Sequence, residues 1–183
     1  MTKRFFDFVF SIFFLFILGV FILFFTLISS FDTNSWGIFA QPRIGQYGKI
    51  FIIYKIKTIN PKTNRSSKLG LFFRRYRIDE WPQLWNVLIG EMSFVGPRPD
   101  IEGYYDRLQG EERKLLELKP GITSEAALKY SNENKILNMQ PDPKVYNDTV
   151  VFPDKVKMNL DYYYNKTILL DIKIIVKTLI KIL

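Results

Sequence analysis

Two adjacent carboxylates, Asp79 and Glu80, directly follow three arginines, Arg74, Arg75 and Arg77, in the stretch RRYRIDEW. Nearby positive charge favours the ionised form of an acid. An anionic oxygen beside arginines can hold magnesium or attack a phosphorus atom that the arginines have bound. Glu80 could position the metal, act as a base or balance the local charge. The alternative is that Asp79 only caps a helix and the arginines form a solvated face.

A second candidate is the corner Gly96-Pro97-Arg98-Pro99. Two prolines restrict the backbone around Arg98, so its guanidinium group can be directed at an anion with little loss of entropy. Lys55 and Lys57 alternate along a β-rich segment and could offer further phosphate contacts. Alternate lysines are also typical of the solvent-facing side of a strand. Both interpretations of the lysines stay open.

The composition restricts the chemistry that these residues can perform. The 183 residues include no cysteine and no histidine, which excludes a disulfide framework, a thiolate nucleophile and the commonest general base. Catalysis must therefore use carboxylates, hydroxyls, Lys or Arg, and an oxygen-binding cation such as Mg²⁺ is a candidate addition. The formal net charge of +8 favours acidic partners, such as phosphorylated substrates, anionic lipids or nucleic acid.

The elements that must position the acids can be predicted from local patterns. Asp79 lies at an expected helix start, where Pro82 is tolerated, and Gly90 should end that helix. Met92–Val95 is expected to be a short strand that leads into the Arg98 corner. Five apolar residues recur at helical spacing and predict a face directed to the core: Trp81, Leu84, Trp85, Leu88 and Ile89.

The rest of the globular part predicts a small α+β fold with more helix than strand. Two β-rich segments, Ile38–Pro42 and Ile50–Ile59, flank a turn with two glycines and predict a hairpin. Three later segments have helical patterning: Ile101–Leu118, Glu125–Leu137 and Lys155–Asn165. We place the boundary of this domain at residues 32–183, after a membrane-embedded segment at residues 1–31.

Phe8–Ile28 is almost continuously apolar and long enough to cross a hydrocarbon core of about 30 Å as a helix. Lys3 and Arg4 precede it and should keep the N-terminus cytoplasmic. A simple crossing would place the strongly basic remainder outside the cytoplasm. A re-entrant hairpin that bends near Gly19 would keep both ends inside. Hydropathy favours the spanning helix and charge favours the hairpin.

The C-terminal segment, residues 166–183, predicts a second membrane contact. Lys173, Lys177 and Lys181 recur every fourth residue in an otherwise apolar helix. This pattern is typical of an amphipathic helix in the lipid interface, with lysines reaching toward anionic head groups. The equally weighted alternative is a helix that packs on the protein and exposes its lysines to water.

With these residues assembled, the chain resembles the bacterial sugar transferases, the small monotopic phosphoglycosyl transferases. The resemblance covers nearly the whole length and rests mainly on RIDEWPQLWNVLIGEMSFVGPRP. Supporting motifs are KRFFDF, FAQPRIG, FIIYKIKT, KPGIT and LDYYYNKTILLDIKI. Two places depart from the family pattern: Gly19-Val20 replaces a common Ser-Pro pair, and Ser124-Glu125-Ala126 follows KPGIT where many members have Gly-Trp-Ala.

The resemblance implies a Mg²⁺-dependent reaction in which Asp79 attacks the β-phosphate of a UDP-sugar. UMP leaves, and a polyprenol (undecaprenyl) phosphate then collects the phosphosugar from the enzyme. By the same resemblance, Glu80 helps in metal positioning or acid–base work, and Asp79 and Glu80 are the metal-binding residues. Arg98 becomes a phosphate-binding residue. Arg74, Lys55 and Lys57 match recurring basic positions and are further substrate-binding candidates.

The resemblance also implies a place in the cell. The expected location is the cytoplasmic face of the bacterial inner membrane, with a re-entrant helix-break-helix in contact with membrane lipids. The reaction would begin a glycan such as a capsule or lipopolysaccharide. A homo-oligomer and the glycosyltransferases of the same pathway are further candidate partners.

A second hypothesis is a non-catalytic, basic, membrane-anchored protein that binds lipid or serves as a scaffold. It accounts for the net charge, the apolar N-terminus and the C-terminal lysines, but gives no reason for the acidic pair and the Arg98 corner to occur together. We expect no nucleic-acid partner, because no recognisable nucleic-acid-binding motif is present.

Overall fold

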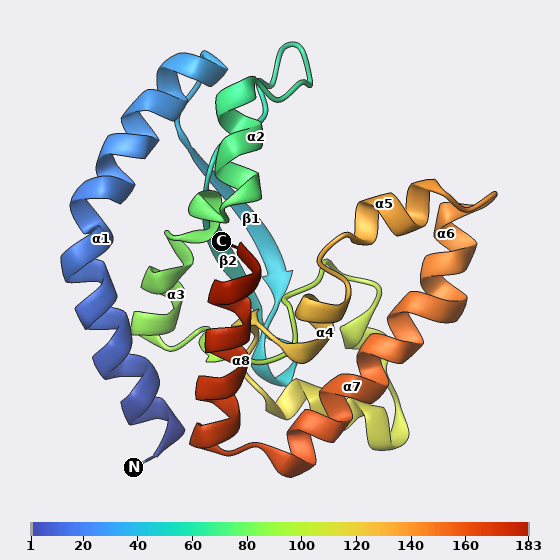
Figure 1. The fold of residues 1–183 in the computed structure, drawn as a ribbon. Coiled ribbons are helices and arrows are strands. Elements are labelled where there is room, and N and C mark those ends of the chain that lie inside the picture. The colour runs from blue at the N-terminus through green and yellow to red at the C-terminus, as the bar shows by residue number, and fades with distance from the viewer. Residues whose placement is uncertain (1, 183) are drawn as a thin grey trace. The chain divides into compact units, whose positions relative to one another are not determined.

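The structure is a computed structural model that describes residues 2–182. The chain divides into two compact units. Unit 1 contains residues 2–43, 50–93 and 182, and unit 2 contains residues 44–49 and 94–181. Helices dominate both, with short strand pairs, which confirms the predicted helix-rich α+β class. Each unit is described separately below, with the element labels of Figure 1.

Unit 1 combines one long helix, a hairpin and two short helices. The strands β1 (Ile38–Ile44) and β2 (Ile50–Ile56) form a two-stranded sheet, which confirms the predicted hairpin. The other elements are α1 (Lys3–Thr33), α2 (Lys68–Arg75), the 3₁₀ turn η2 (Ile78–Glu80) and α3 (Gln83–Ile89). A buried apolar cluster of Ile56, Phe73 and Ile78 joins β2, α2 and η2, and Phe25 of α1 and Trp81 pack against it.

Helix α1 places its polar side chains inward and its apolar side chains outward. Its buried residues include Asp7, Ser11, Ser29 and Thr33, whereas Phe16 is 88% exposed and Val20 73% exposed. Among the described helices, α1 is the one whose length and composition would allow it to cross a membrane. The helix runs through Gly19 without interruption, so the break that a hairpin needs is absent there. Its membrane topology remains a prediction.

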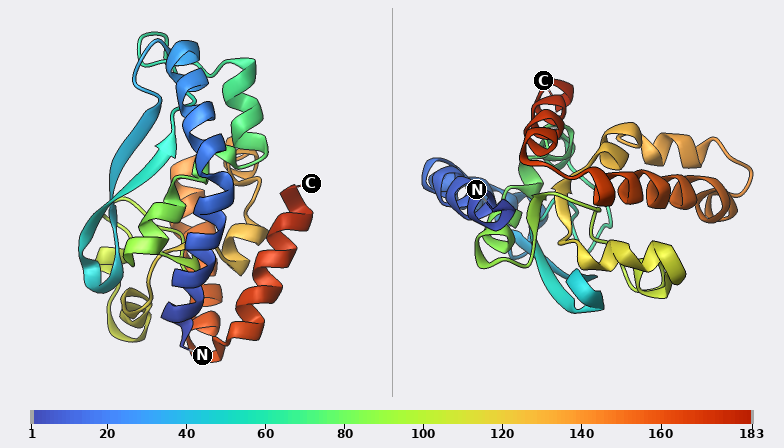
Figure 2. Two further views of the ribbon diagram at one scale, coloured as in Figure 1. Left: turned by 90° about the vertical axis from the view of Figure 1, so that its left-hand side faces the viewer. Right: turned by 90° about the horizontal axis from the view of Figure 1, so that it is seen from below.

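Both ends of α1 are bonded to other elements of unit 1. Near the N-terminus, the guanidinium group of Arg4 donates to the carbonyls of Val87 and Leu88, each at 2.6 Å, in the last turn of α3. A cation is favourable at a helix C-terminus. Near the other end, the Ser29 hydroxyl donates to the Lys57 carbonyl just after β2. Figures 1 and 2 show α1 lying beside α3, in agreement with these bonds.

The core-facing stripe predicted for α3 is partly wrong. Gly90, in the left-handed region with φ 89°, ends α3 as predicted. The buried positions of the helix, however, include the polar residues Gln83 and Asn86, while Trp85 and Ile89 are about half exposed. Asn86 donates to the Ile52 carbonyl of β2 and to a Glu91 carboxylate oxygen, both at 2.7 Å. The buried face of α3 therefore combines these polar residues with apolar Leu84 and Val87, while Trp85 and Ile89 point outward.

Unit 2 begins with a short strand pair and continues as helices. The strand β3 (Ser93–Val95) pairs with β4 (Gly121–Thr123), and its first residue belongs to unit 1. The 3₁₀ segments are η1 (Gln46–Gly48), η3 (Tyr105–Arg107) and η4 (Gly110–Glu117). The α-helices are α4 (Glu125–Lys129), α5 (Glu133–Asn138), α6 (Pro143–Tyr146), α7 (Phe152–Asn165) and α8 (Ile168–Ile182). Helix α6 leads into α7 through a π-helical turn, Asn147–Val151 (Figure 1).

Two predicted helices of unit 2 are interrupted. Residues 101–118 form two 3₁₀ segments, because Gly103 and Gly110 adopt positive φ angles of 106° and 55° that a regular helix does not accommodate. Residues 125–137 divide into α4 and α5, with Tyr130–Asn132 between them. The third predicted helix is confirmed as part of α7.

Helix α8 confirms the helix predicted at the C-terminus, while its position in a lipid interface stays a prediction. Its inner face is bonded through polar groups: the Tyr162 hydroxyl donates to Asp171 at 2.6 Å, and the Thr123 and Thr178 hydroxyls lie 2.7 Å apart. Its outward face carries exposed apolar side chains, among them Leu169, at 80% exposed, and Ile180, at 70%. Like α1, α8 thus exposes large apolar side chains, while its buried residues include apolar Ile174 as well as Asp171.

Candidate functional site

Asp79 is the middle residue of the 3₁₀ turn η2, between α2 and α3. It is half-buried, and it does not have the helix-capping position that the sequence suggested, because Pro82 directly precedes α3. Arg77, the residue before the turn, has a left-handed backbone with φ 53° and ψ 23°. This conformation is strained for a residue with a side chain and is found preferentially at functional sites.

Glu80 is the centre of a compact ion-pair cluster that we call the Glu80 cluster, formed by Lys55, Arg77 and Glu80. The Lys55 ammonium group donates to one carboxylate oxygen at 3.2 Å, and the Arg77 guanidinium group donates to the other at 2.9 Å. The Glu80 side chain is only 8% exposed. Each oxygen of this buried carboxylate therefore has its own cation, which fixes the backbone directly after Asp79.

Two further predicted residues of unit 1, Arg74 and Lys57, each donate a hydrogen bond to a hydroxyl group. The Arg74 guanidinium donates to the hydroxyl of buried Thr58 at 2.8 Å, and the Lys57 ammonium donates to the Ser35 hydroxyl at 3.2 Å. These hydrogen bonds are to neutral hydroxyls, which leaves the positive charge of both side chains uncompensated by those partners. Such cations can attract a phosphate group.

Arg98 lies in unit 2 and is exposed on the corner that follows β3. The corner is held by backbone bonds, in which the Gly96 amide donates to Thr123 at 3.1 Å and the Gly121 amide donates to Pro97 at 2.8 Å. A Cβ atom on Gly96 would lie 2.3 Å from the Lys119 carbonyl oxygen. The structure thus brings the GPRP and KPGIT motifs together, and the glycines allow the close backbone approach.

Arg77 is a site residue that the sequence analysis mentioned but did not select. Its spacing of three residues from Glu80 is a signal that was available, because residues i and i+3 are neighbours on a helical turn. The left-handed backbone of Arg77 could not be predicted from the sequence. Arg77 precedes the turn, and its side chain reaches Glu80 from there.

The acidic residues of the site can supply only some of the ligands that a divalent cation needs. Within residues 2–182, no group of three acidic side chains is gathered as a metal site. Both oxygens of Glu80 are ion-paired, which favours its role in balancing charge over direct coordination. Magnesium is commonly bound by one or two carboxylates together with substrate phosphates. Asp79 fits that arrangement as the protein ligand, with a diphosphate substrate supplying further oxygens.

The family model described as bacterial sugar transferase matches residues 1–183. The chain belongs to the bacterial sugar transferase family. This confirms the resemblance drawn from the sequence motifs. The matched region of this chain contains both motifs whose geometry is described above, the acidic pair of η2 and the Arg98 corner.

Individual relatives of the family are similar over much of the chain. A sugar transferase of Bacillus subtilis (strain 168), EpsL, described as uncharacterized, is 32% identical over 99% of this chain and 87% of its own length. A putative undecaprenyl-phosphate N-acetylgalactosaminyl 1-phosphate transferase of the same organism is 34% identical over 61% of this chain and 68% of its own. The UDP-glucose:undecaprenyl-phosphate glucose-1-phosphate transferase of Xanthomonas campestris pv. campestris is 31% identical over 79% of this chain, which covers 31% of that protein.

Proposed function

We propose that this bacterial sugar transferase moves a sugar 1-phosphate from a UDP-sugar to a polyprenol phosphate in the membrane. The products are UMP and a polyprenyl-diphosphate-linked sugar, the first membrane intermediate of a surface glycan. The family membership and the transferase activities for which two relatives are named support this reaction class. The observation that carries it is Asp79 directly beside a buried carboxylate whose two oxygens are already neutralised by cations.

The first step is attack by Asp79. One oxygen of its carboxylate forms a bond to the β-phosphorus of the UDP-sugar, and the bond from that phosphorus to the bridging oxygen breaks. UMP leaves with the bridging oxygen and its electron pair. Because Lys55 and Arg77 hold Glu80, the turn can present Asp79 in one orientation, which lowers the entropic cost of attack.

The second step returns Asp79 to its starting form. An oxygen of the polyprenol phosphate bonds to the phosphorus of the Asp79 adduct, and the bond between that phosphorus and the aspartyl oxygen breaks. Lys57, Arg74 and Arg98 are the proposed phosphate-binding residues in both steps. Bound Mg²⁺ would neutralise negative charge on the diphosphate, with Asp79 as its protein ligand.

The bonding of α1 supports a monotopic arrangement, with both ends of the helix on one side of the membrane. At 1.5 Å per residue, 31 helical residues extend about 46 Å, more than a hydrocarbon core of about 30 Å. Yet Arg4 at one end and Ser29 near the other both bond to unit 1. A helix that crossed the bilayer would separate these ends by the membrane, whereas a helix embedded from one side keeps both with the same unit.

The nucleophile is tested by trapping the covalent adduct. Purified full-length protein is mixed with Mg²⁺ and UDP-sugars carrying a radiolabelled sugar, without polyprenol phosphate, and quenched in acid. The expected result is label on wild-type protein and UMP in equal amount. Asp79→Asn should lose the label and lower turnover at least ~10³-fold, while Asp161→Asn, on the exposed face of α7, should keep both.

Full turnover by Asp79→Asn would show that Asp79 is not the nucleophile. Failure of any UDP-sugar to release UMP in the presence of Mg²⁺ and polyprenol phosphate would instead favour the non-catalytic scaffold. These two outcomes are separate, because the first concerns one residue and the second concerns the reaction as a whole.

A further inference from the structure

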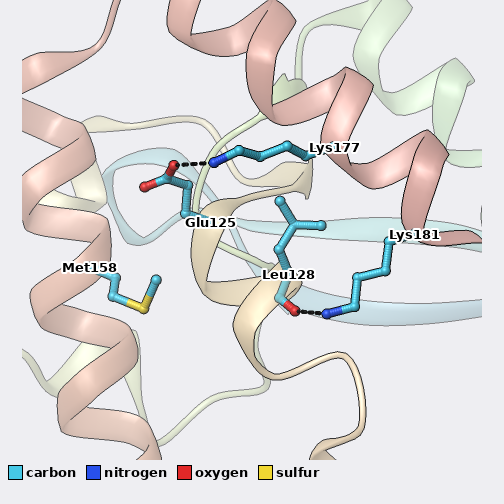
Figure 3. Close-up of a pocket in the computed structure, with 5 residues that line it drawn as sticks. All are labelled: Glu125, Leu128, Met158, Lys177 and Lys181. Carbon is cyan, nitrogen blue, oxygen red and sulfur yellow. Dashed lines mark hydrogen bonds and ion pairs between the residues drawn. The ribbon is translucent and has the colours of Figure 1, made fainter.

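A cavity of about 410 Å³ lies within unit 2, between α4, α7 and α8. Its lining combines two apolar side chains, Leu128 and Met158, with three charged ones, Glu125, Lys177 and Lys181 (Figure 3). We call it the α8 groove. Its volume is within the range of about 300–1,000 Å³ that is usual for small-molecule sites. The proposed transfer reaction makes no use of it.

The two lysines of the groove come from α8, one helical turn apart, and both are directed at α4. The Lys177 ammonium lies 3.6 Å from a Glu125 carboxylate oxygen, and the Lys181 ammonium donates to the Leu128 carbonyl at 2.7 Å (Figure 3). They are therefore not simply the outward lysine ridge that the sequence predicted. With two lysines and one glutamate, the charged lining has a net charge of +1.

The bonds that hold these lysines are exchangeable. The Lys177 and Glu125 side chains are 50% and 41% exposed, and an ion pair this exposed to water contributes little to stability. The bond of Lys181 is to a neutral carbonyl. A lipid phosphodiester carries one negative charge shared by two free oxygens, so it can compete with Glu125 for Lys177 and accept hydrogen bonds from both ammonium groups at once. The surplus positive charge thus selects an anion.

The surroundings of the groove indicate that this anion is attached to a lipid. The outward face of α8 exposes Leu169, Val176 and Ile180, and the groove itself contains Leu128 and Met158. An exposed apolar helix face next to paired lysines matches the boundary between acyl chains and head groups. A soluble inorganic phosphate has no apolar group that could pack against this lining.

We propose that the α8 groove binds the phosphate head group of an anionic membrane lipid. Lys177 and Lys181 contact the phosphate, and the start of the acyl chains lies against the apolar lining. In this arrangement the lipid displaces Glu125 from Lys177. The site belongs to unit 2 alone and does not depend on the proposed transfer reaction, so it is tested by binding and not by activity.

The test uses full-length protein in a neutral detergent. Dioctanoyl phosphatidylglycerol is titrated and its binding measured by native mass spectrometry. Dioctanoyl phosphatidylcholine is the zwitterionic comparison, in which the choline cation compensates the charge of the same phosphate. Phosphatidylglycerol should bind at least ~10-fold more tightly than phosphatidylcholine, and Lys177→Gln with Lys181→Gln should remove that preference, since both charge-assisted contacts to the phosphate are lost. Lys157→Gln with Lys173→Gln removes the same charge from exposed positions outside the groove and should retain the preference.

Glu125 provides a change in the opposite direction. Glu125→Gln should tighten phosphatidylglycerol binding several-fold, because the competing carboxylate is gone, whereas Glu102→Gln, an equal change of charge elsewhere in unit 2, should not. Thermal melting of each variant identifies those that remain folded. If the double lysine variant melts early, Lys177→Gln alone provides the same comparison.

Three results would overturn the proposal. The first is equal binding of the two lipids by wild-type protein. The second is an equal loss of phosphatidylglycerol binding in the groove variant and in the control pair. The third is binding of sn-glycerol 3-phosphate as tight as that of phosphatidylglycerol, which would identify a soluble phosphate as the occupant.

Discussion

Two glutamates of this chain pair with lysines in contrasting surroundings. Glu80 in unit 1 is 8% exposed and has a cation on each oxygen, at 3.2 and 2.9 Å. Glu125 in unit 2 is 41% exposed and has one lysine, at 3.6 Å. Water screens the second pair and barely reaches the first. The comparison indicates that Glu80 is a fixed part of the turn that carries Asp79, whereas Glu125 is a partner that a ligand can replace.

The largest effect should come from neutralising the buried glutamate. Glu80→Gln leaves the Lys55 and Arg77 charges without their carboxylate, and loss of one partner from a buried ion pair costs about 3 kcal/mol of unfolding free energy or more. For a chain of this length, we expect the melting temperature to fall by about 6–12 °C. The measurement is thermal unfolding of full-length protein in detergent, followed by tryptophan fluorescence.

Glu125→Gln is the matched control, because it makes the same chemical change at the exposed pair. Its melting temperature should fall by less than about 3 °C. Similar losses for both variants would contradict the distinction between a fixed and an exchangeable glutamate. They would also weaken the argument that Lys177 is available to a lipid phosphate.

Substitutions of Arg77 can distinguish the effect of backbone strain on stability from the effect of the ion pair with Glu80. Arg77→Ala and Arg77→Gly both remove the bond to Glu80, but only glycine adopts φ 53° without steric cost. We expect Arg77→Gly to be about 1 kcal/mol more stable than Arg77→Ala, although glycine is the more flexible residue. Chemical denaturation of the two variants measures this difference.

The same pair of variants reports on function. If the cluster orients Asp79, both variants should lose turnover by a similar factor despite their difference in stability, and Glu80→Gln should lose it too. Unchanged turnover in Arg77→Gly would limit Arg77 to a structural role. An alanine variant as stable as the glycine variant would show that the left-handed backbone is not a source of strain.

The sequence predicted elements better than it predicted which way they face. The hairpin, the end of α3 at Gly90 and the helices at α7 and α8 all follow from local patterns that depend on neighbouring residues only. The prediction of a core-directed face on α3 was partly wrong, because periodicity identifies which residues share a face of a helix. It does not tell whether that face packs on the protein or lies at the surface. Trp85 and Ile89 share a face, and that face points outward while Asn86 binds β2.

The sequence was sufficient to predict which residues belong to the candidate site, but not which of them form ion pairs with one another. The motif identified Asp79, Glu80 and Arg98, and the alternation of Lys55 and Lys57 placed both on one side of the predicted strand, although β2 itself ends at Ile56. That Lys55 reaches Glu80, 25 residues away, depends on how β2 packs on the turn. Local sequence carries no signal for that contact, and the left-handed Arg77 is likewise fixed by its surroundings.

A third carboxylate, Asp154, provides the mildest test of the comparison. It lies on α7 and accepts hydrogen bonds from Lys129 and Tyr130, each at 2.7 Å. The bond from Lys129, followed by that from Tyr130, lowers the pKa of Asp154. Desolvation, followed by the bond to Asp154, raises the pKa of Tyr130 to about 12. This partly exposed group should behave like Glu125 and contribute little stability.

The sign of the pH dependence follows from these shifts. A tyrosine whose pKa is raised above its unfolded value of about 10 stabilises the fold fully below pH ~10 and loses that contribution as the pH rises toward 12. Tyr130→Phe cannot ionise, so between pH 10 and 12 its melting temperature should fall by about 2 °C less than that of wild type. Parallel curves would show that Tyr130 does not titrate in this range, and a much larger difference would place Asp154 with Glu80 and not with Glu125.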